Sequence, residues 1–174
     1  MPRKSEAAAG SAKISGPAQQ AQAMGWALVL LRVFVGAKFL QAGIGKLDWI
    51  GTESLARQLT QWTTGPNPAA LSSYVSVLRQ FVLPHAAVFT YLVVFGELLV
   101  GIFLILGLLT RAATLPALLM NMSYLLATWN LGAATQGFNE AMLAMELALL
   151  LSGAGRLCGL DMTLARKHPQ WPLW

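Results

Sequence analysis

Apolar residues gather in four long runs, which are separated by two short polar turns and one longer mixed segment. The runs predict helices at about 24–45, 85–109, 112–131 and 138–154. A helix needs about 20 residues to cross the hydrocarbon core of a bilayer, with a lower limit near 17. The pattern therefore predicts an all-α integral membrane protein, built as a bundle of four transmembrane helices.

The segment between the first two runs has helical periodicity but is too polar to cross a membrane. Leu55, Leu59 and Trp62 repeat at helical spacing before a break at 63–66. Asn67 is a good N-cap for a second helix with Pro68 at its first position, ending at Pro84. The apolar positions of this second helix share one face: Leu71, Tyr74, Val75, Leu78 and Val82. We expect two amphipathic helices that lie along the membrane surface or plug the outer end of the bundle.

The two ends of the chain are more polar than its middle. Residues 1–23 are rich in Ala, Gly, Ser and Gln and are predicted to form a disordered tail. The apolar run that follows contains Arg32 and Lys38 and lacks a small-residue cleavage site, which favours an uncleaved first span over a secretory signal. We expect a membrane domain at 24–161, followed by a short tail at 162–174.

Composition strengthens the membrane interpretation. Hydrophobic residues make up 56% of the chain and charged residues 11%, respectively above and below the values of soluble domains. A net charge of +5 could indicate nucleic-acid binding, but the basic residues lie at the ends of the apolar runs and form no stripe. We therefore expect lipid and other subunits as partners, in a homo- or hetero-oligomer, and no nucleic acid.

Few residues could hold a redox group. Cys158 is the single cysteine, so the chain has no internal disulfide and no CxxC pair, and it has only two histidines. We expect neither a metal nor a haem site. Redox chemistry would then need a diffusible carrier or a partner subunit.

Charged residues within the apolar runs are the main candidates for chemistry. Arg32 and Lys38 lie in the first run, Glu97 in the second and Glu146 in the fourth. A charge at the centre of a bilayer costs about 2.5–3.5 kcal/mol on insertion scales, so these residues need partners. Antiparallel helices could bring Arg32 and Glu97 together, and we expect this pair. Gly36, which shares a helix face with Arg32, would allow a neighbouring helix to approach closely.

Two interpretations of these charges remain open. They could be buried ion pairs that fix the register of the helices. They could also line a polar pocket for a quinone head group or a proton path, because ionisable groups inside a membrane are functional candidates by default.

Three segments carry a resemblance to a known family. They are LRVFVGAKFLQAGIGKL at 31–47, GELLVGIFLILGLLTRAA at 96–113 and GAGRLCGLD at 153–161. In these segments the chain resembles the DoxX/DoxD family of small bacterial membrane proteins. The long segment between the first two spans is more similar to the DoxD branch. The residues that the resemblance singles out are Arg32, Lys46, Glu97, Arg111, Arg156 and Asp161.

The resemblance implies a function as well as a fold. The DoxD branch implies the membrane subunit of a thiosulfate:quinone oxidoreductase in a bacterial plasma membrane. We expect a subunit of such a quinone-linked complex, with a quinone as diffusible carrier, and not a complete enzyme. The candidate quinone-binding residues are Arg32, Lys38, Lys46, Glu97 and Glu146. The alternative is a non-catalytic subunit that anchors a larger assembly, with its charges fully paired in a dry core.

Basic residues outside the spans indicate the orientation. With the N-terminus inside, the inner side holds seven of them: Arg3, Lys4, Lys13, Arg111, Arg156, Arg166 and Lys167. The outer side then holds three: Lys46, Arg57 and Arg79. The excess of Lys and Arg on cytoplasmic loops predicts that both termini lie in the cytoplasm.

Reporter fusions test this orientation. A reporter that works only in the cytoplasm should be active when it is fused after Lys167. A reporter that works only outside the cytoplasm should be active when it is inserted at 64–67. A periplasmic C-terminus would contradict the whole arrangement of spans.

Overall fold

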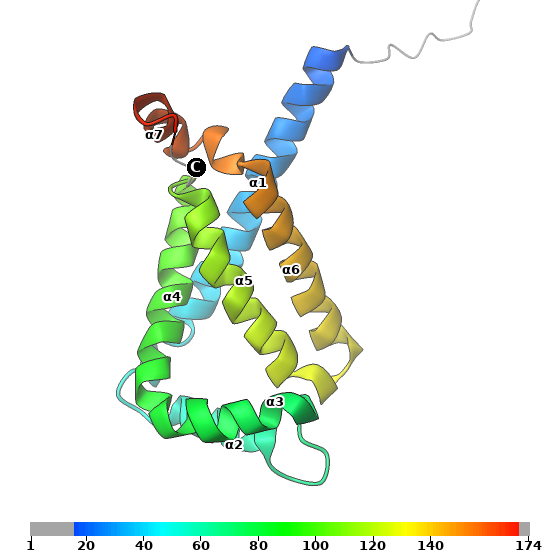
Figure 1. Cartoon of the computed structure of the whole chain (residues 1–174), viewed down its shortest axis with the longest axis vertical. Coiled ribbons are helices and arrows are strands. Elements are labelled where there is room, and N and C mark those ends of the chain that lie inside the picture. Colours follow the sequence, from blue (N-terminus) through cyan, green and yellow to red (C-terminus); the bar gives the residue numbers. More distant parts are fainter. Residues whose placement is uncertain (1–15, 171–174) are drawn as a thin grey trace, which may run out of the picture.

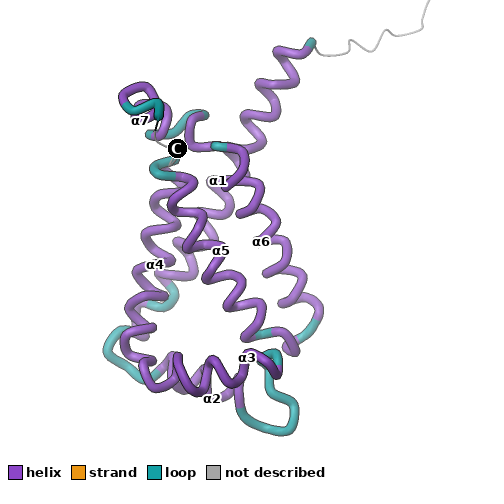
Figure 2. Tube along the Cα trace, in the orientation of Figure 1, coloured by secondary structure: helices purple, strands orange, loops and turns teal. Residues whose placement is uncertain are grey.

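A computed structural model describes residues 16–170, and all regular structure in this range is helical (Figure 2). The longer helices are α1 (Pro17–Ile44), α4 (Ala86–Leu106), α5 (Thr110–Ala127) and α6 (Ala133–Ser152). The shorter α-helices are α2 (Ser54–Thr63), α3 (Ser72–Val77) and α7 (Asp161–Lys167). Single turns occur at Leu47–Trp49, Leu78–Val82, Leu83–His85, Trp129–Leu131 and Ala154–Arg156.

The long helices run along the long axis of the molecule, and α2 and α3 cross this axis at one end (Figure 1). The α1 helix packs mainly on α4, and α5 packs on both α4 and α6. Within the described residues, the segments Gln19–Trp49 and Ser72–Leu106 are long and apolar enough to cross a membrane. The α5 and α6 helices contain more polar residues and do not reach this level of apolarity.

Several helix boundaries differ from those expected. The α1 helix begins at Pro17, so part of the expected N-terminal tail is helical and its first turns project beyond the bundle (Figure 1). Residues 1–15 of that tail lie outside the described range. The expected C-terminal tail includes α7, and its last residues, 171–174, also lie outside that range.

The helix expected to begin at Pro68 begins instead at Ser72. The backbone before it is used for contacts with other helices, because Ala70 donates to the carbonyl of Trp62 and Leu71 to that of Leu126. The same helix does not stop at Pro84. A π turn and a 3-10 turn carry the helical path into α4, and proline is tolerated in the first turn of such a segment.

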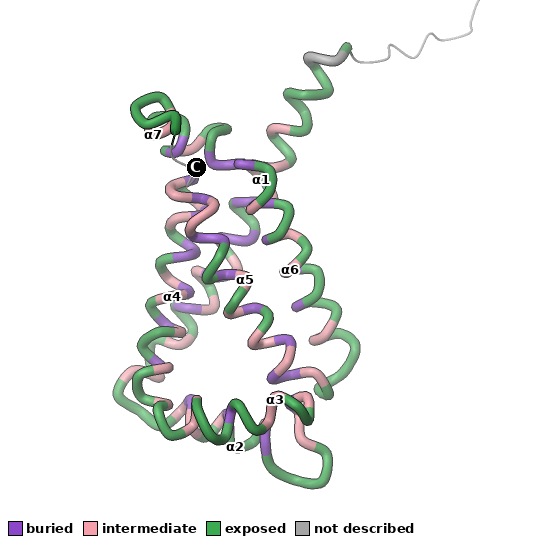
Figure 3. Tube along the Cα trace, in the orientation of Figure 1, coloured by how far each residue is buried: buried purple, intermediate pink, exposed green. Residues whose placement is uncertain are grey.

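Apolar side chains cover the surface, and the buried positions (Figure 3) hold charged and polar side chains as well as apolar ones. The exposed face of α4 is a continuous apolar stripe: Val88, Leu92, Phe95, Leu99, Ile102 and Leu106. The interior contains charged and polar side chains: Arg32, Thr90, Glu97, Thr110, Thr114, Asn121, Asn139, Glu146 and Asp161. An apolar surface with charged groups buried inside is typical of a protein surrounded by lipid.

Glycines bring α1 and α4 into close contact, as expected from the sequence. A Cβ atom at Gly101 of α4 would lie 2.6 Å from the backbone nitrogen of Leu40, and one at Gly36 would lie 3.0 Å from the carbonyl oxygen of Gly101. Small residues allow such approach between helices in lipid, where packing replaces the hydrophobic effect as the driving force.

The α2 and α3 helices close one end of the bundle with a small apolar core. Its buried members are Leu55, Leu59, Ala70, Leu78 and Ala127. The periodicity of the sequence identified most of these positions. The plug expected as one of two alternatives is therefore present, with α5 contributing Ala127.

A buried aspartate ties the opposite end together. The carboxylate of Asp161 accepts hydrogen bonds from the backbone N–H of Leu109, at 2.6 Å, and of Thr110, at 2.9 Å. These groups begin α5, where N–H groups lack helical partners and a negative charge is favourable. A Cβ atom at Gly155 would lie 1.9 Å from Asp161 Oδ2, so only glycine fits there. The segment around α7 is held to the bundle in this way.

Two glycine substitutions test the close contact between α1 and α4. Gly101→Ala should destabilise the protein by about 1–3 kcal/mol, because the added methyl group overlaps the backbone of Leu40. Gly137→Ala is the matched control, since a Cβ atom at this helical position meets nothing within 4 Å. Thermal unfolding in detergent should show a lower Tm for Gly101→Ala and an equal or higher Tm for Gly137→Ala. Equal Tm values for the two variants would contradict the observed packing.

Candidate functional site

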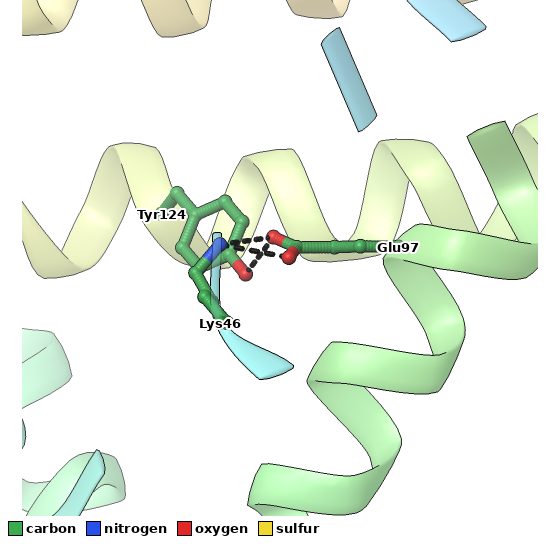
Figure 4. Close-up of polar contacts among 3 residues, drawn as sticks. All are labelled: Lys46, Glu97 and Tyr124. Carbon is green, nitrogen blue, oxygen red and sulfur yellow. Dashed lines mark hydrogen bonds and ion pairs between the residues drawn. The ribbon is translucent and has the colours of Figure 1, made fainter. Parts of the chain in front are cut away.

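The carboxylate of Glu97 lies at the centre of a three-residue cluster (Figure 4). The Nζ atom of Lys46 lies 2.7 Å from each carboxylate oxygen. The hydroxyl of Tyr124 donates to Glu97 Oε1 at 2.6 Å. Glu97 comes from the middle of α4, Lys46 from the turn after α1, and Tyr124 from the last turns of α5. The cluster joins three helices at one point.

Burial strengthens the electrostatic attraction between the Lys46 and Glu97 charges. The side chain of Glu97 is 1% exposed and that of Lys46 is 20% exposed. The Lys46 ammonium also lies 5.5 Å from the ring centroid of Tyr124 and 6.0 Å from that of Trp49. Charge-assisted hydrogen bonds and cation–π contacts together replace the water that both charges lose.

A cavity of about 440 Å³ adjoins the cluster between α1, α4, α5 and α6. Lys46, Glu97 and Tyr124 line it, together with polar side chains from three helices: Lys38, Gln41, Asn121, Thr128, Thr135 and Asn139. Its apolar lining residues are Phe39, Ala42, Phe138 and Met142. Gln41 and Phe138 are exposed, so the cavity opens to the outside between α1 and α6. Its volume falls in the range of small-molecule sites.

Two further polar contacts lie at the wall of this cavity. The amide of Asn121 donates to Glu146 Oε1 at 2.8 Å, and that of Asn139 donates to the hydroxyl of Thr128 at 3.3 Å. Glu146 itself is completely buried, and its Oε2 atom has no hydrogen-bond partner among the described residues. Asn121 therefore links a buried carboxyl group to the cavity.

Lys38 lies near the mouth of the cavity. Its side chain is half-buried, and its ammonium lies 5.6 Å from the ring centroid of Phe34. No carboxylate pairs with it in the part of the chain that the structure describes. Lys38 can therefore donate to a molecule that enters between α1 and α6.

The expected pair of Arg32 with Glu97 is wrong. The guanidinium of Arg32 donates to three backbone carbonyls after α6, those of Ala154, Leu157 and Cys158, at 2.9–3.2 Å. It lies against Gly107, ten residues beyond Glu97, or about 15 Å along a helix. The sequence placed Arg32 near mid-membrane, but α1 extends past the bundle, so Arg32 lies at the bundle's end.

Sequence analysis missed the contribution of α5. Asn121, Tyr124 and Thr128 all face the cavity. They recur at spacings of three and four residues from the second half of α5 to the residue after its end, which places them on one face. This polar periodicity was the signal that could have identified them. Of the candidates from the sequence, the structure brings together Lys38, Lys46 and Glu97, with Glu146 one side chain away.

The arrangement suits a planar, polar head group better than an ion. The Lys38 ammonium and the remaining N–H groups of the Asn121 and Asn139 amides can donate hydrogen bonds to carbonyl oxygens, while Phe39 and Phe138 can contact a ring. No group of three or more His, Cys, Asp or Glu side chains in residues 16–170 could hold a metal ion.

Two charge exchanges test the assignment of partners. Exchanging Lys46 and Glu97 (Lys46→Glu with Glu97→Lys) should restore part of the stability that either single variant loses, because the two groups contact each other. Exchanging Arg32 and Glu97 should restore none, since their partners are different. The measurement is the Tm of each single and double variant in detergent. Rescue by the Arg32–Glu97 exchange alone would overturn the structural assignment.

No solved structure matches the chain. Residues 26–173 match a protein family described as TQO small subunit DoxD, where TQO denotes thiosulfate:quinone oxidoreductase. The match extends from within α1 to beyond α7 and includes every residue of the Glu97 cluster. The chain therefore belongs to the DoxD family of membrane proteins.

Proposed function

We propose that this protein is the membrane subunit of a quinone-linked redox complex and binds a quinone head group in the cavity beside Glu97. The description of the family supports a thiosulfate:quinone oxidoreductase as that complex. The observation that carries the proposal is the cavity of about 440 Å³, with donors from three helices inside an apolar-surfaced bundle.

We infer that all four long helices cross a bacterial plasma membrane with both termini in the cytoplasm. The α5 and α6 helices, of 18 and 20 residues, are long enough to cross the hydrocarbon core. Thr114 and Asn121 of α5 and Asn139 and Glu146 of α6 are buried, where the cost of placing polar groups in a membrane is reduced. The exposed Glu140 lies in the first half of α6. The count of basic residues supports this orientation. The cavity then lies in the outer half of the membrane, on the side of α2 and α3.

The cluster can serve the chemistry of quinone reduction, which takes up two electrons and two protons. Lys38 and the amides of Asn121 and Asn139 can hydrogen-bond the quinone carbonyls. Tyr124 can pass its proton to one reduced oxygen and regain one from Lys46 through Glu97, and the Lys38 ammonium can supply the second proton. The electrons must come from a partner subunit or a sulfur compound, because the chain has one cysteine and two histidines.

A second function is favoured by a different observation. The terminal nitrogens of the Arg32 guanidinium donate to three backbone carbonyls, and the side chain is 1% exposed, as expected of a charge with a structural role. If the Glu97 cluster had the same role, the protein would be a non-catalytic anchor for a larger membrane assembly. The two functions therefore differ in what the Glu97 cluster does.

Tyr124→Phe separates the two functions. Removing the hydroxyl leaves both bonds between Lys46 and Glu97, so the protein should fold and assemble. Quinone reduction by the complex purified from membranes should fall by about 100-fold, the size of a lost general acid. The measurement is the rate of decylubiquinone reduction at saturating electron donor.

Tyr91→Phe is the matched control, because Tyr91 lies on the exposed face of α4 and lines neither cavity. This variant should retain the full rate. A Tyr124→Phe complex that assembles and reduces decylubiquinone at the control rate would favour the anchoring function.

A further inference from the structure

A second cavity, of about 450 Å³, lies on the other side of Tyr124. It is enclosed by α2, the helical segment from α3 to α4, and α5. Its lining is mostly aliphatic and aromatic: Leu55, Leu59, Trp62, Tyr74, Leu78, Val82, Phe89, Leu92, Val93, Gly96, Pro116, Leu119, Met120, Ser123, Tyr124 and Ala127. No charged residue contributes to this lining.

Two of the polar side chains in this lining, Ser123 and Tyr124, are already bonded elsewhere, and the other two, Trp62 and Tyr74, are half-buried. The hydroxyl of Ser123 donates to the carbonyl of Leu119 at 2.9 Å, within α5. The hydroxyl of Tyr124 donates to Glu97 on the side of the first cavity. A buried water needs two to four polar partners, and apolar cavities without them stay dry or take apolar guests. The second cavity therefore suits a hydrocarbon better than water.

The second cavity can be entered from the lipid. Leu92 on α4 and Leu119 on α5 line it, and their side chains are 60% and 71% exposed. These two residues flank the opening of the cavity on the apolar surface of the bundle, and we call them its lip residues. A hydrocarbon chain can pass between them without crossing a polar region.

Tyr124 belongs to the walls of both cavities. On α4 the neighbouring residues Gly96 and Glu97 divide in the same way, with Gly96 lining the apolar cavity and Glu97 the polar one. A polar cavity and an apolar cavity thus adjoin at Tyr124, whose bond to Glu97 joins α5 to α4 between them. This juxtaposition matches a molecule with a polar ring at one end and an apolar chain at the other.

We propose that the second cavity binds the isoprenoid chain of the quinone whose head group occupies the first cavity. The inference rests on the proposed function, because it takes the head group to be a quinone. The chain contributes binding energy through apolar burial, and the ring is positioned by the donors around Glu97. Together the two cavities select prenylated quinones over chain-free ones. Tyr124 lies where ring and chain meet.

Paired tryptophan substitutions test this proposal. Leu92→Trp obstructs one lip of the second cavity. Leu99→Trp is its matched control, because Leu99 lies two turns away on the same helix, is similarly exposed at 52%, and lines neither cavity. Leu119→Trp and Leu115→Trp form a second such pair on α5. All four side chains face outward, so the variants should fold; their Tm in detergent verifies this.

The measurement is binding of two probes to the full chain in lipid nanodiscs: a long-chain ubiquinone and the same head group without a chain. Leu92→Trp and Leu119→Trp should weaken binding of the long-chain quinone by about tenfold and leave binding of the chain-free head group unchanged. Both controls should bind both probes as the unaltered protein does.

Three results would overturn the proposal. In the first, the lip variants bind the long-chain quinone normally. In the second, these variants weaken the binding of the long-chain quinone and of the chain-free head group equally. In the third, the purified protein retains a phospholipid that long-chain quinone does not displace, which would assign the cavity to an acyl chain. The chain-free probe keeps the two proposals separate, because its failure to bind the unaltered protein would count against the proposed function itself.

Discussion

The burial of one carboxylate organises the half of the bundle that holds the cavities. Glu97 lies in the middle of an apolar helix, with 1% of its side chain exposed, so its charge must be compensated within the protein. Lys46 and Tyr124 supply that compensation from the end of α1 and from α5. Three helices are thus fixed relative to one another. Tyr124, held in this way, separates a polar cavity from an apolar one.

The two ends of the bundle are built differently, and this difference creates the space for the cavities. At the end near α7, Arg32 and Asp161 bind backbone groups directly, and Gly155 leaves no free volume beside the aspartate. At the other end the side chains of Lys46, Glu97 and Tyr124 join the long helices, and the apolar core of α2 and α3 covers them. The first cavity lies between the long helices beside this cluster.

Arg32 and Lys46 illustrate how one charge type serves two purposes. The planar guanidinium of Arg32 can satisfy several carbonyls at once, which suits the closure of a chain turn. The ammonium of Lys46 is a compact charge on a flexible stem, and it binds both oxygens of a carboxylate beside an open cavity. Under the proposed function, Arg32 maintains the fold and the Lys46–Glu97–Tyr124 cluster handles the substrate.

The sequence by itself determined the helical class, the positions of the four long helices, the amphipathic segment between the first two and the glycine contact between α1 and α4, because each depends on local periodicity. It also pointed to Lys38, Glu97 and Glu146, since charged residues are conspicuous in apolar runs, and the family resemblance added Lys46. Only the tertiary structure decided that Arg32 binds carbonyls, that Lys46 neutralises Glu97 and that Tyr124 joins them. Partner choice depends on the relative height of neighbouring helices, which is set by where α1 meets the end of the bundle and not by spacing along one chain segment.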